Sequence, residues 1–230
     1  MRKPSTLLLA IGGAVIAIAV VVALAGYGGA EFPGTAASPV VSPRAGQTSA
    51  SSAEAAVLWP APPDPLERTV AAGLVPEPKE YLTNHVHAHL DVFVDGRPIV
   101  VPSGIGINVD DPDVRRFDEP DGSVSYGGIE LCSTPCISPL HTHDATGIIH
   151  TESSSSEPNT LGQFFTEWGV ELNATCVGEY CSPQPIAFYV NGEPYTDDPR
   201  AIELTDLKEI ALVIGTPPAE IPATADFSNS

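Results

Sequence analysis

The histidines of this chain stand in two short runs with the spacing of metal ligands. The runs NHVHAHLD at 84–91 and HTHDATGIIH at 141–150 contain all six histidines of the 230 residues. They are His85, His87 and His89 in the first run and His141, His143 and His150 in the second. On a β-strand alternate side chains share a face and lie ~6.6 Å apart, so a His-x-His pair can hold one ion at ~2.0–2.1 Å. The spacing therefore predicts a metal site built by both runs.

Carboxylates accompany the histidines and help to narrow the metal. Asp91, Asp144 and Glu152 are candidate ligands or hydrogen-bond acceptors for the imidazoles. Imidazole with carboxylate suits zinc, copper(II), nickel or non-haem iron, and the only methionine is Met1, which disfavours a thioether copper(I) site. We expect copper(II) or zinc(II). Two readings without a metal stay open, namely buried structural histidines and an acid-sensing histidine cluster.

Three functions are compatible with such a site. The first is a protein that captures a transition metal for storage, sensing, delivery or detoxification. The second is a metal-dependent enzyme in which one coordination position stays open, with Asp144, Glu152 or a fourth histidine as the acid–base group. The third is a structural domain fastened by one ion. No Ser-His-Asp order, P-loop, GxGxxG or HExxH motif is present to indicate other chemistry, and no catalytic residue is assigned.

Four cysteines form two close pairs, Cys132 with Cys136 and Cys176 with Cys181. An even count outside the cytoplasm favours disulfides, and local pairing is expected, although sequence alone leaves three connectivities open. The spacing is also compatible with a cysteine zinc site. Oxidised cysteines cannot bind a metal, which would leave the histidines as the main donors.

The net charge of −19 argues against some partners. Acidic residues spread over the domain repel nucleic-acid phosphates and anionic lipids. We therefore expect no nucleic-acid partner, and the sequence identifies no protein partner. An acidic field does raise the local concentration of cations.

The N-terminal region predicts a membrane anchor. About 20 uncharged residues between Leu7 and Gly29 suffice to cross a ~30 Å hydrocarbon core as one helix. Arg2 and Lys3 precede this run, and no basic residue follows until Arg44. The positive-inside rule then places the N-terminus in the cytoplasm and the remainder outside a plasma membrane crossed once. A cleaved signal peptide is the alternative, and it exports the remainder equally.

Composition divides the chain into four parts. They are a transmembrane anchor at 1–29, an Ala/Ser/Pro-rich extended linker at 30–65, a metal-binding domain at 66–222 and a loose tail at 223–230. A domain of this size can bury a sizeable core without help.

The domain shows strand and helix signals in alternation. Asp95-Gly96 and Asn191-Gly192 each follow a β-rich run, which is the strongest short signal for a hairpin. Between them, TLGQFFTEWG at 160–169 has a capping box, an aromatic face at helical spacing and a glycine stop. The apolar run at 209–215 predicts a buried final strand. The fold class is therefore α+β, with a mixed sheet and one main amphipathic helix.

Strand geometry assigns the faces of the first histidine run. His85, His87, His89 and Asp91 share one face of the strand, and the apolar residues between them share the other. We expect the apolar face to pack on the aromatic face of the helix. The inserted segment, which contains the second run and the pair Cys132 and Cys136, is expected to fold back over the open face and bring its histidines to those of the strand. Ile148, His150 and Glu152 are expected on one face of this segment.

Two resemblances accompany these patterns. The order VFVDG, TLGQFFTEWG, YVNG and EIALVIG resembles the β-grasp pattern of the small sulfur-carrier proteins of thiamine and molybdopterin synthesis, with a large insertion after the first hairpin. Their terminal Gly-Gly is absent, so the likeness implies a β-grasp fold and no carrier function. The motifs HVHAHLDVFVDG and LHTHDATGIIHTES also resemble an uncharacterised family of membrane-anchored proteins of actinobacteria and archaea, which implies no assigned activity.

Overall fold

A computed structural model describes residues 57–228, which belong to one compact unit of the chain. The expected anchor at 1–29 and the expected linker up to residue 56 lie outside the described residues. Within residues 57–228, none of the helices has the length and apolar character needed to span a bilayer.

The described residues alternate strands and short helices along the chain. The strands are β1 (Asn84–Val94), β2 (Arg97–Ile99), β3 (Arg115–Asp118), β4 (Val124–Gly127), β5 (Leu140–His141), β6 (Ile148–Ser153), β7 (Cys176–Val177), β8 (Tyr180–Cys181), β9 (Ile186–Val190), β10 (Glu193–Tyr195) and β11 (Lys208–Ile214). The helices are α1 (Pro65–Ala71), α2 (Leu161–Trp168) and the 3-10 helix η1 (Pro199–Ala201).

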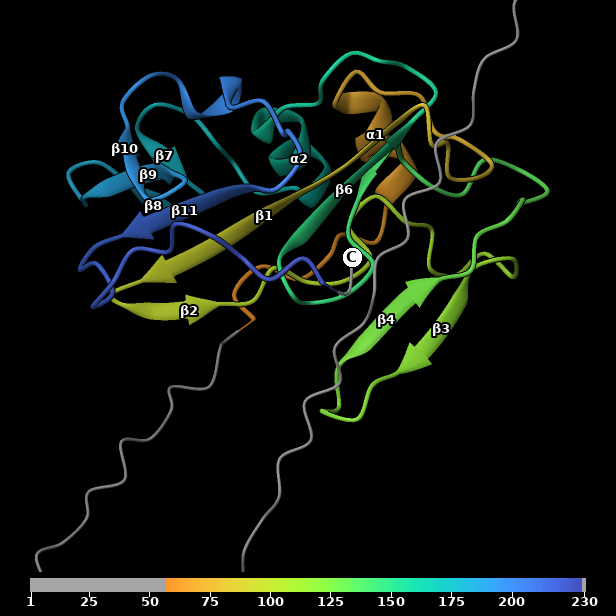
Figure 1. The fold of residues 1–230 in the computed structure, drawn as a ribbon, viewed down its shortest axis with the longest axis horizontal. Coiled ribbons are helices and arrows are strands. Elements are labelled where there is room, and N and C mark those ends of the chain that lie inside the picture. Colours follow the sequence, from red (N-terminus) through yellow and green to blue (C-terminus); the bar gives the residue numbers. More distant parts are fainter. Residues whose placement is uncertain (1–56, 229–230) are drawn as a thin grey trace, which may run out of the picture. The chain divides into compact units, whose positions relative to one another are not determined.

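One mixed sheet organises the domain. Its strand order is β10-β9-β11-β1-β6-β5, and β2 pairs with the end of β1 that β6 leaves uncovered. β1 and β11 run parallel, whereas the other pairs of this sheet are antiparallel. Figure 1 shows β1 and β11 at the centre of the sheet. The predicted mixed α+β architecture is confirmed.

Both predicted hairpin turns are present. Asp95 and Gly96 between β1 and β2 have φ of 48° and 74°, and Asn191 and Gly192 between β9 and β10 have φ of 51° and 81°. Positive φ at both central residues is the requirement of the tight turn that matches the twist of two antiparallel strands. The turns therefore fix the register of both hairpins.

Helix α2 is the predicted amphipathic helix. The Thr160 hydroxyl accepts a hydrogen bond from the Gln163 backbone N–H, the Gln163 side chain accepts one from the Thr160 N–H, and Gly169 ends the helix in the left-handed conformation. The aromatic side chains Phe164, Phe165 and Trp168 are buried.

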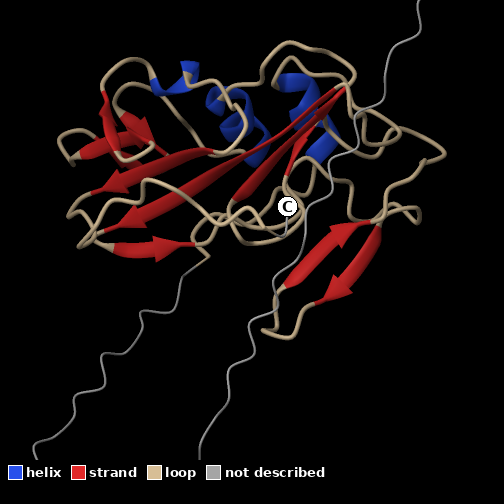
Figure 2. Cartoon of the chain, in the orientation of Figure 1, coloured by secondary structure: helices blue, strands red, loops and turns tan. Residues whose placement is uncertain are grey.

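The core lies between the helices and one face of the sheet. Ala88, Leu90 and Val92 of β1 belong to the same buried cluster as the aromatic side chains of α2. Figure 2 shows α1 and α2 on this side of the sheet and the β3–β4 hairpin on the other side. The apolar face of β1 packs as predicted, and its histidine face is directed away from the helices.

The segment between β2 and α2 differs from the prediction in one respect. It does not fold over the open face of the sheet but extends the sheet at its edge, because β6 pairs antiparallel with β1 and β5 pairs with β6. Backbone hydrogen bonds with β1 satisfy the polar groups of β6, which a segment lying across the face could not obtain. Within this segment, the β3–β4 hairpin stands off the open face (Figure 1).

Both ends of the described chain contact the domain. Trp59, inside the expected linker, packs edge-on against Trp168 with 5.7 Å between ring centroids, and its carbonyl accepts a hydrogen bond from Trp168 Nε1. Phe227, inside the expected loose tail, has its ring 6.4 Å from that of His89. The packed part of the chain therefore begins before residue 66.

Candidate metal centre

Sheet register brings the two histidine runs together. His87 on β1 lies directly opposite His150 on β6, and His150 lies directly opposite His141 on β5. Residues that are directly opposite one another share a face, with Cβ atoms ~4.5–5.5 Å apart. Three imidazoles from three neighbouring strands therefore form a row across the open face of the sheet.

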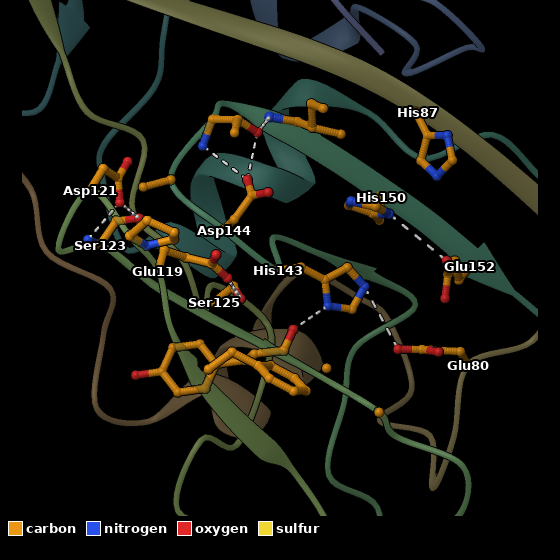
Figure 3. A pocket seen from close by; sticks show the side chains of 18 of the residues that line it. Glu80, His87, Glu119, Asp121, Ser123, Ser125, His143, Asp144, His150 and Glu152 are labelled. Carbon is orange, nitrogen blue, oxygen red and sulfur yellow. Dashed lines mark hydrogen bonds and ion pairs between the residues drawn. The ribbon is translucent and has the colours of Figure 1, made fainter. Parts of the chain in front are cut away.

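Two further imidazoles join the row, His85 beside His87 and His143 beside both His150 and His141. Ring centroids are 4.8 Å apart for His85 and His87, 4.6 Å for His87 and His150, 4.5 Å for His150 and His143, and 4.7 Å for His143 and His141. Figure 3 shows His87, His150 and His143 beside one another, with Glu152 and Glu80 next to them. Five of the six candidate histidines thus form one continuous cluster in which each ring lies close to at least one other.

Backbone carbonyls fix the tautomers of His141 and His143. His141 Nδ1 lies 2.9 Å from the Ser138 carbonyl oxygen, and His143 Nδ1 lies 2.7 Å from the Tyr126 carbonyl oxygen. A carbonyl oxygen only accepts, so each Nδ1 carries a hydrogen and donates it. In the neutral rings, the lone pair is therefore on Nε2.

The two Nε2 atoms face each other at 3.1 Å. With a lone pair on each, neither nitrogen can donate to the other, and the contact is repulsive without a cation beside it. Two nitrogens bonded to one tetrahedral ion at ~2.0–2.1 Å are separated by about 3.3 Å. The pair thus has the separation of two ligands of one ion, and a carbonyl acceptor on the opposite ring nitrogen is the usual partner of a metal-bound histidine.

The rings of this pair are neutral near pH 7. Burial lowers the pKa of His141 well below its ordinary value, and the neighbouring His143 and His150 lower it further. Burial and then His150 also lower the pKa of His143. Burial, with His150 and His85, lowers the pKa of His87. Neutral imidazole is the form that binds a metal.

Glu152 completes the arrangement from the same strand as His150. Its carboxylate is 3.2 Å from His85 Nε2 and 3.8 Å from His150 Nδ1. The group of His141, His143, His150 and Glu152 could hold a metal ion, as could the group of His85, His87 and Glu152, because the donor atoms of each lie within 4.8 Å of one another.

Three buried atoms of this cluster have no hydrogen-bond partner among residues 57–228. They are His87 Nε2, His150 Nδ1 and Glu152 Oε2. A buried polar atom without a partner costs about 1–3 kcal/mol, more for a charged group. His150 and Glu152 belong to one group that could hold a metal ion, and His87 and Glu152 to another, so bound cations would give all three atoms a partner.

His89 stands apart from the row. Its Nδ1 is 2.8 Å from Glu209 Oε2, and its Nε2 is 2.8 Å from the Thr146 carbonyl oxygen. Burial alone lowers the pKa of His89, but the hydrogen bond and charge of Glu209, with the charge of Asp91, outweigh burial and raise it. Both ring nitrogens of His89 are therefore used by the protein, although His89, Asp91 and Glu209 also form a group that could hold an ion.

The other candidate residues have separate roles. The Asp144 carboxylate accepts hydrogen bonds from the backbone N–H and hydroxyl of Thr146, and Figure 3 shows it away from Glu152. Asp91 lies near His89 at 3.9 Å and not in the row. The cysteines form the expected disulfides, Cys132–Cys136 and Cys176–Cys181. A group of Asp111, Asp113 and Cys132 is therefore no metal site, since its sulfur is in a disulfide.

Three glutamates near the site were not found from the sequence. Glu80 Oε1 is 3.7 Å from His143 Nε2, Glu209 pairs with His89, and Glu167 accepts a hydrogen bond from the hydroxyl of Ser138. Burial raises the pKa of Glu167 to about 8 and keeps its carboxyl neutral. Since the Ser138 carbonyl orients His141, Glu167 supports the site from the core side. Glu80 precedes β1 in a stretch without periodicity, so no sequence signal indicated it.

A cavity of about 930 Å³ opens onto the histidine face. The β3–β4 hairpin supplies Phe117, Ser125 and Tyr126 to its wall, and His85, His87, His143, His150 and Glu152 line its other side. Its described lining contains five carboxylates, Glu152 included, and no lysine or arginine. The cavity thus suits cations and gives a small molecule access to an ion bound by the row.

Comparisons of the chain with protein-family models, with curated proteins and with solved structures found no match. The family resemblance of the histidine motifs therefore stays a prediction.

Proposed function

We propose that this protein binds a transition metal, copper(II) or zinc(II), through His141, His143, His150 and Glu152. The observation that carries the proposal is the 3.1 Å approach of His141 Nε2 and His143 Nε2, two lone pairs that backbone carbonyls aim at each other. A bound cation converts this repulsion into two coordinate bonds. The buried nitrogen and carboxylate of His150 and Glu152 then supply further ligands.

Three imidazoles and one carboxylate favour a borderline metal. This donor set suits zinc and copper(II), and it contains neither the thiolate or thioether of a soft copper(I) site nor the all-oxygen shell of calcium or magnesium. A ligand set fixed by sheet register also holds its geometry before the metal arrives. Capture of an ion would therefore require little rearrangement of the chain.

The proposal places this domain outside the cell on a single-pass anchor, with the N-terminus in the cytoplasm. The apolar run from Leu7 to Gly29 supports the anchor, and two disulfides support an oxidising compartment. We further propose a β-grasp fold with an insertion. The hairpin β1–β2, helix α2, hairpin β9–β10 and final strand β11 follow one another as in that pattern, and the five strands among them belong to one sheet, which supports it.

A metal-dependent enzyme is the second candidate, and the cavity favours it. A cavity of about 930 Å³ beside His143, His150 and Glu152 has the size of a ligand pocket. Catalysis would require an open coordination position facing this space. Glu80, at 3.7 Å from His143 Nε2, would then be the acid–base group nearest to the ion.

Elemental analysis of the full-length chain, purified in detergent without a histidine tag, tests the proposal. We expect at least one equivalent of copper or zinc per chain to survive dialysis. The double variant His141→Gln/His143→Gln should lose it, because it removes two of the four ligands.

The matched control is His89→Gln, a substitution of the same kind in a histidine that lies outside the row. It should retain the metal, and far-UV circular dichroism establishes that both variants keep the fold. Equal metal content in the wild type and the double variant, or no uptake of copper or zinc by the wild type, would contradict the proposal. A water-free coordination shell in X-ray absorption spectra would argue against the enzyme.

A further inference from the structure

The row contains more donors than one ion can use. An ion at His141, His143 and His150 takes three nitrogens and one oxygen of Glu152, which fills a tetrahedral shell. The atoms left over are His85 Nε2, His87 Nε2 and the second oxygen of Glu152. Of these, His87 Nε2 and Glu152 Oε2 are buried without a hydrogen-bond partner among the described residues.

We propose that the histidine face holds two ions and that Glu152 bridges them, one oxygen to each. This inference rests on the proposed function and adds a second ion at His85, His87 and Glu152. The two groups of possible ligands have Glu152 in common, so filling both of them places the two ions beside each other.

Sheet register also positions the second group, His85, His87 and Glu152. His85 lies directly opposite Glu152, and His87 lies directly opposite His150. His85 Nε2 accordingly approaches Glu152 Oε1 to 3.2 Å, while the ring centroids of His85 and His87 are 4.8 Å apart. A simple His85–Glu152 ion pair would account for one carboxylate oxygen. It would leave His87 Nε2 and the other oxygen unexplained.

Electrostatics also requires the carboxylate to lie between the ions. Paired metal ions in proteins are ~3.5–4 Å apart, and two divalent charges at that distance repel strongly unless anions screen them. The fully shared Glu152 carboxylate and the nearby Glu80 supply two negative charges at the row. The acidic cavity wall adds Glu119, Asp121 and Asp144 at longer range.

The two positions should fill in order. The first group contains fully buried His141, whereas the His85 side chain of the second group is 40% exposed and the group offers only three ligands. The second ion should therefore bind more weakly and keep open positions on the cavity side.

Copper(II) titration of the metal-free full-length chain in detergent tests the inference. We expect two equivalents per chain at saturation and, in electron paramagnetic resonance, loss of the isolated copper(II) signal as the second equivalent couples to the first. His85→Gln/His87→Gln should bind one equivalent with an uncoupled signal, and this retained ion itself shows that the variant folds. Glu152→Gln should abolish the coupling.

The failures of the two proposals are distinguishable. A wild type that binds no ion overturns the proposed function and this inference together. One uncoupled ion per wild-type chain overturns the second ion while the proposed function stands. Two ions whose signals stay uncoupled at saturation overturn the bridge. Unchanged stoichiometry in His85→Gln/His87→Gln overturns the assignment of the second position.

Discussion

His87 and His89 lie two residues apart on β1 and on the same face of the sheet, yet their surroundings differ. His87 faces His150 across the strand pair, and its buried Nε2 has no hydrogen-bond partner among residues 57–228. His89 faces Glu209 on the other neighbouring strand, and the protein uses both of its ring nitrogens. One histidine is thus left open to an ion and the other is closed by the fold.

The difference shows that a histidine motif identifies candidate metal ligands but does not show which of them bind the metal. The HxHxH run gives three equivalent imidazoles, and the residues opposite them on β6 and β11 separate their roles. On β6, His150 lies opposite His87, and the buried atoms His87 Nε2 and His150 Nδ1 have no hydrogen-bond partner among residues 57–228. On β11 the residue opposite His89 is Glu209, which occupies Nδ1 of that ring, so the metal belongs to the β6 side of the strand, where Glu152 and His150 lie opposite His85 and His87.

Removing the hydrogen-bond partner of His89 should have the largest effect on the stability of the domain and no effect on its metal content. Glu209→Ala removes the partner of His89, whose side chain is only 11% exposed, from a position that is itself fully buried. Breaking a buried pair on one side costs roughly 3 kcal/mol or more. Urea denaturation should show this loss, while elemental analysis shows unchanged metal. Loss of metal in Glu209→Ala would mean that His89 belongs to the site. Glu209→Gln, which keeps the size of the side chain, is the matched variant and should lose less.

The second-largest difference should appear in how the stability of the metal-free domain depends on pH, which should differ between His89 and the histidines of the row. After metal removal, His89 should titrate above the ordinary histidine pKa and His87, His141 and His143 below theirs. The stability that His89 contributes is fully present below its unfolded pKa of ~6.5 and is lost as the pH rises through its raised folded value. The contribution of the three lowered histidines has the opposite sign, since it is present above ~6.5 and is lost as the pH falls.

Histidine NMR titration of the metal-free chain measures these pKa values directly. Urea denaturation at pH 6 and pH 8 tests the signs: His89→Gln should lose more stability at pH 6, and His141→Gln more at pH 8. The same pH dependence of stability in both variants would contradict the distinction between His89 and the histidines of the row.

Local rules explain why much of the architecture could be predicted. The two hairpin turns, the capping box at Thr160 and the glycine stop at Gly169 depend on neighbouring residues, and all of them are present. The alternation of β1 likewise requires only strand geometry, so the apolar face and the histidine face were assigned correctly.

Pairing across long loops could not be predicted in the same way. Between Val94 and Ile148 nothing in the sequence states whether β6 joins the edge of β1 or covers its face. The closing partner of His89 was missed for the same reason, because Glu209 stands at the start of an apolar run and its register with β1 is set only by the parallel pairing. Glu80 acts from outside any regular element. The histidines of the site could be predicted from the sequence, but the separation of His89 from the other five could not.

The smallest effect should come from Asp144, the carboxylate that the histidine motif itself suggests. It follows His143 directly, yet its oxygen accepts hydrogen bonds from the backbone N–H and hydroxyl of Thr146 and so serves the turn that leads into β6. Asp144→Asn keeps an acceptor for both donors, and surface substitutions of this kind change stability by no more than about 0.5 kcal/mol. Metal affinity should change by little more than twofold, measured by competition with a chromogenic chelator, whereas Glu152→Gln in the same assay should weaken binding far more. A loss in Asp144→Asn as large as that in Glu152→Gln would transfer the carboxylate ligand from the strand to the turn, and the metal would then lie on the cavity side of His143 instead of between β5 and β1.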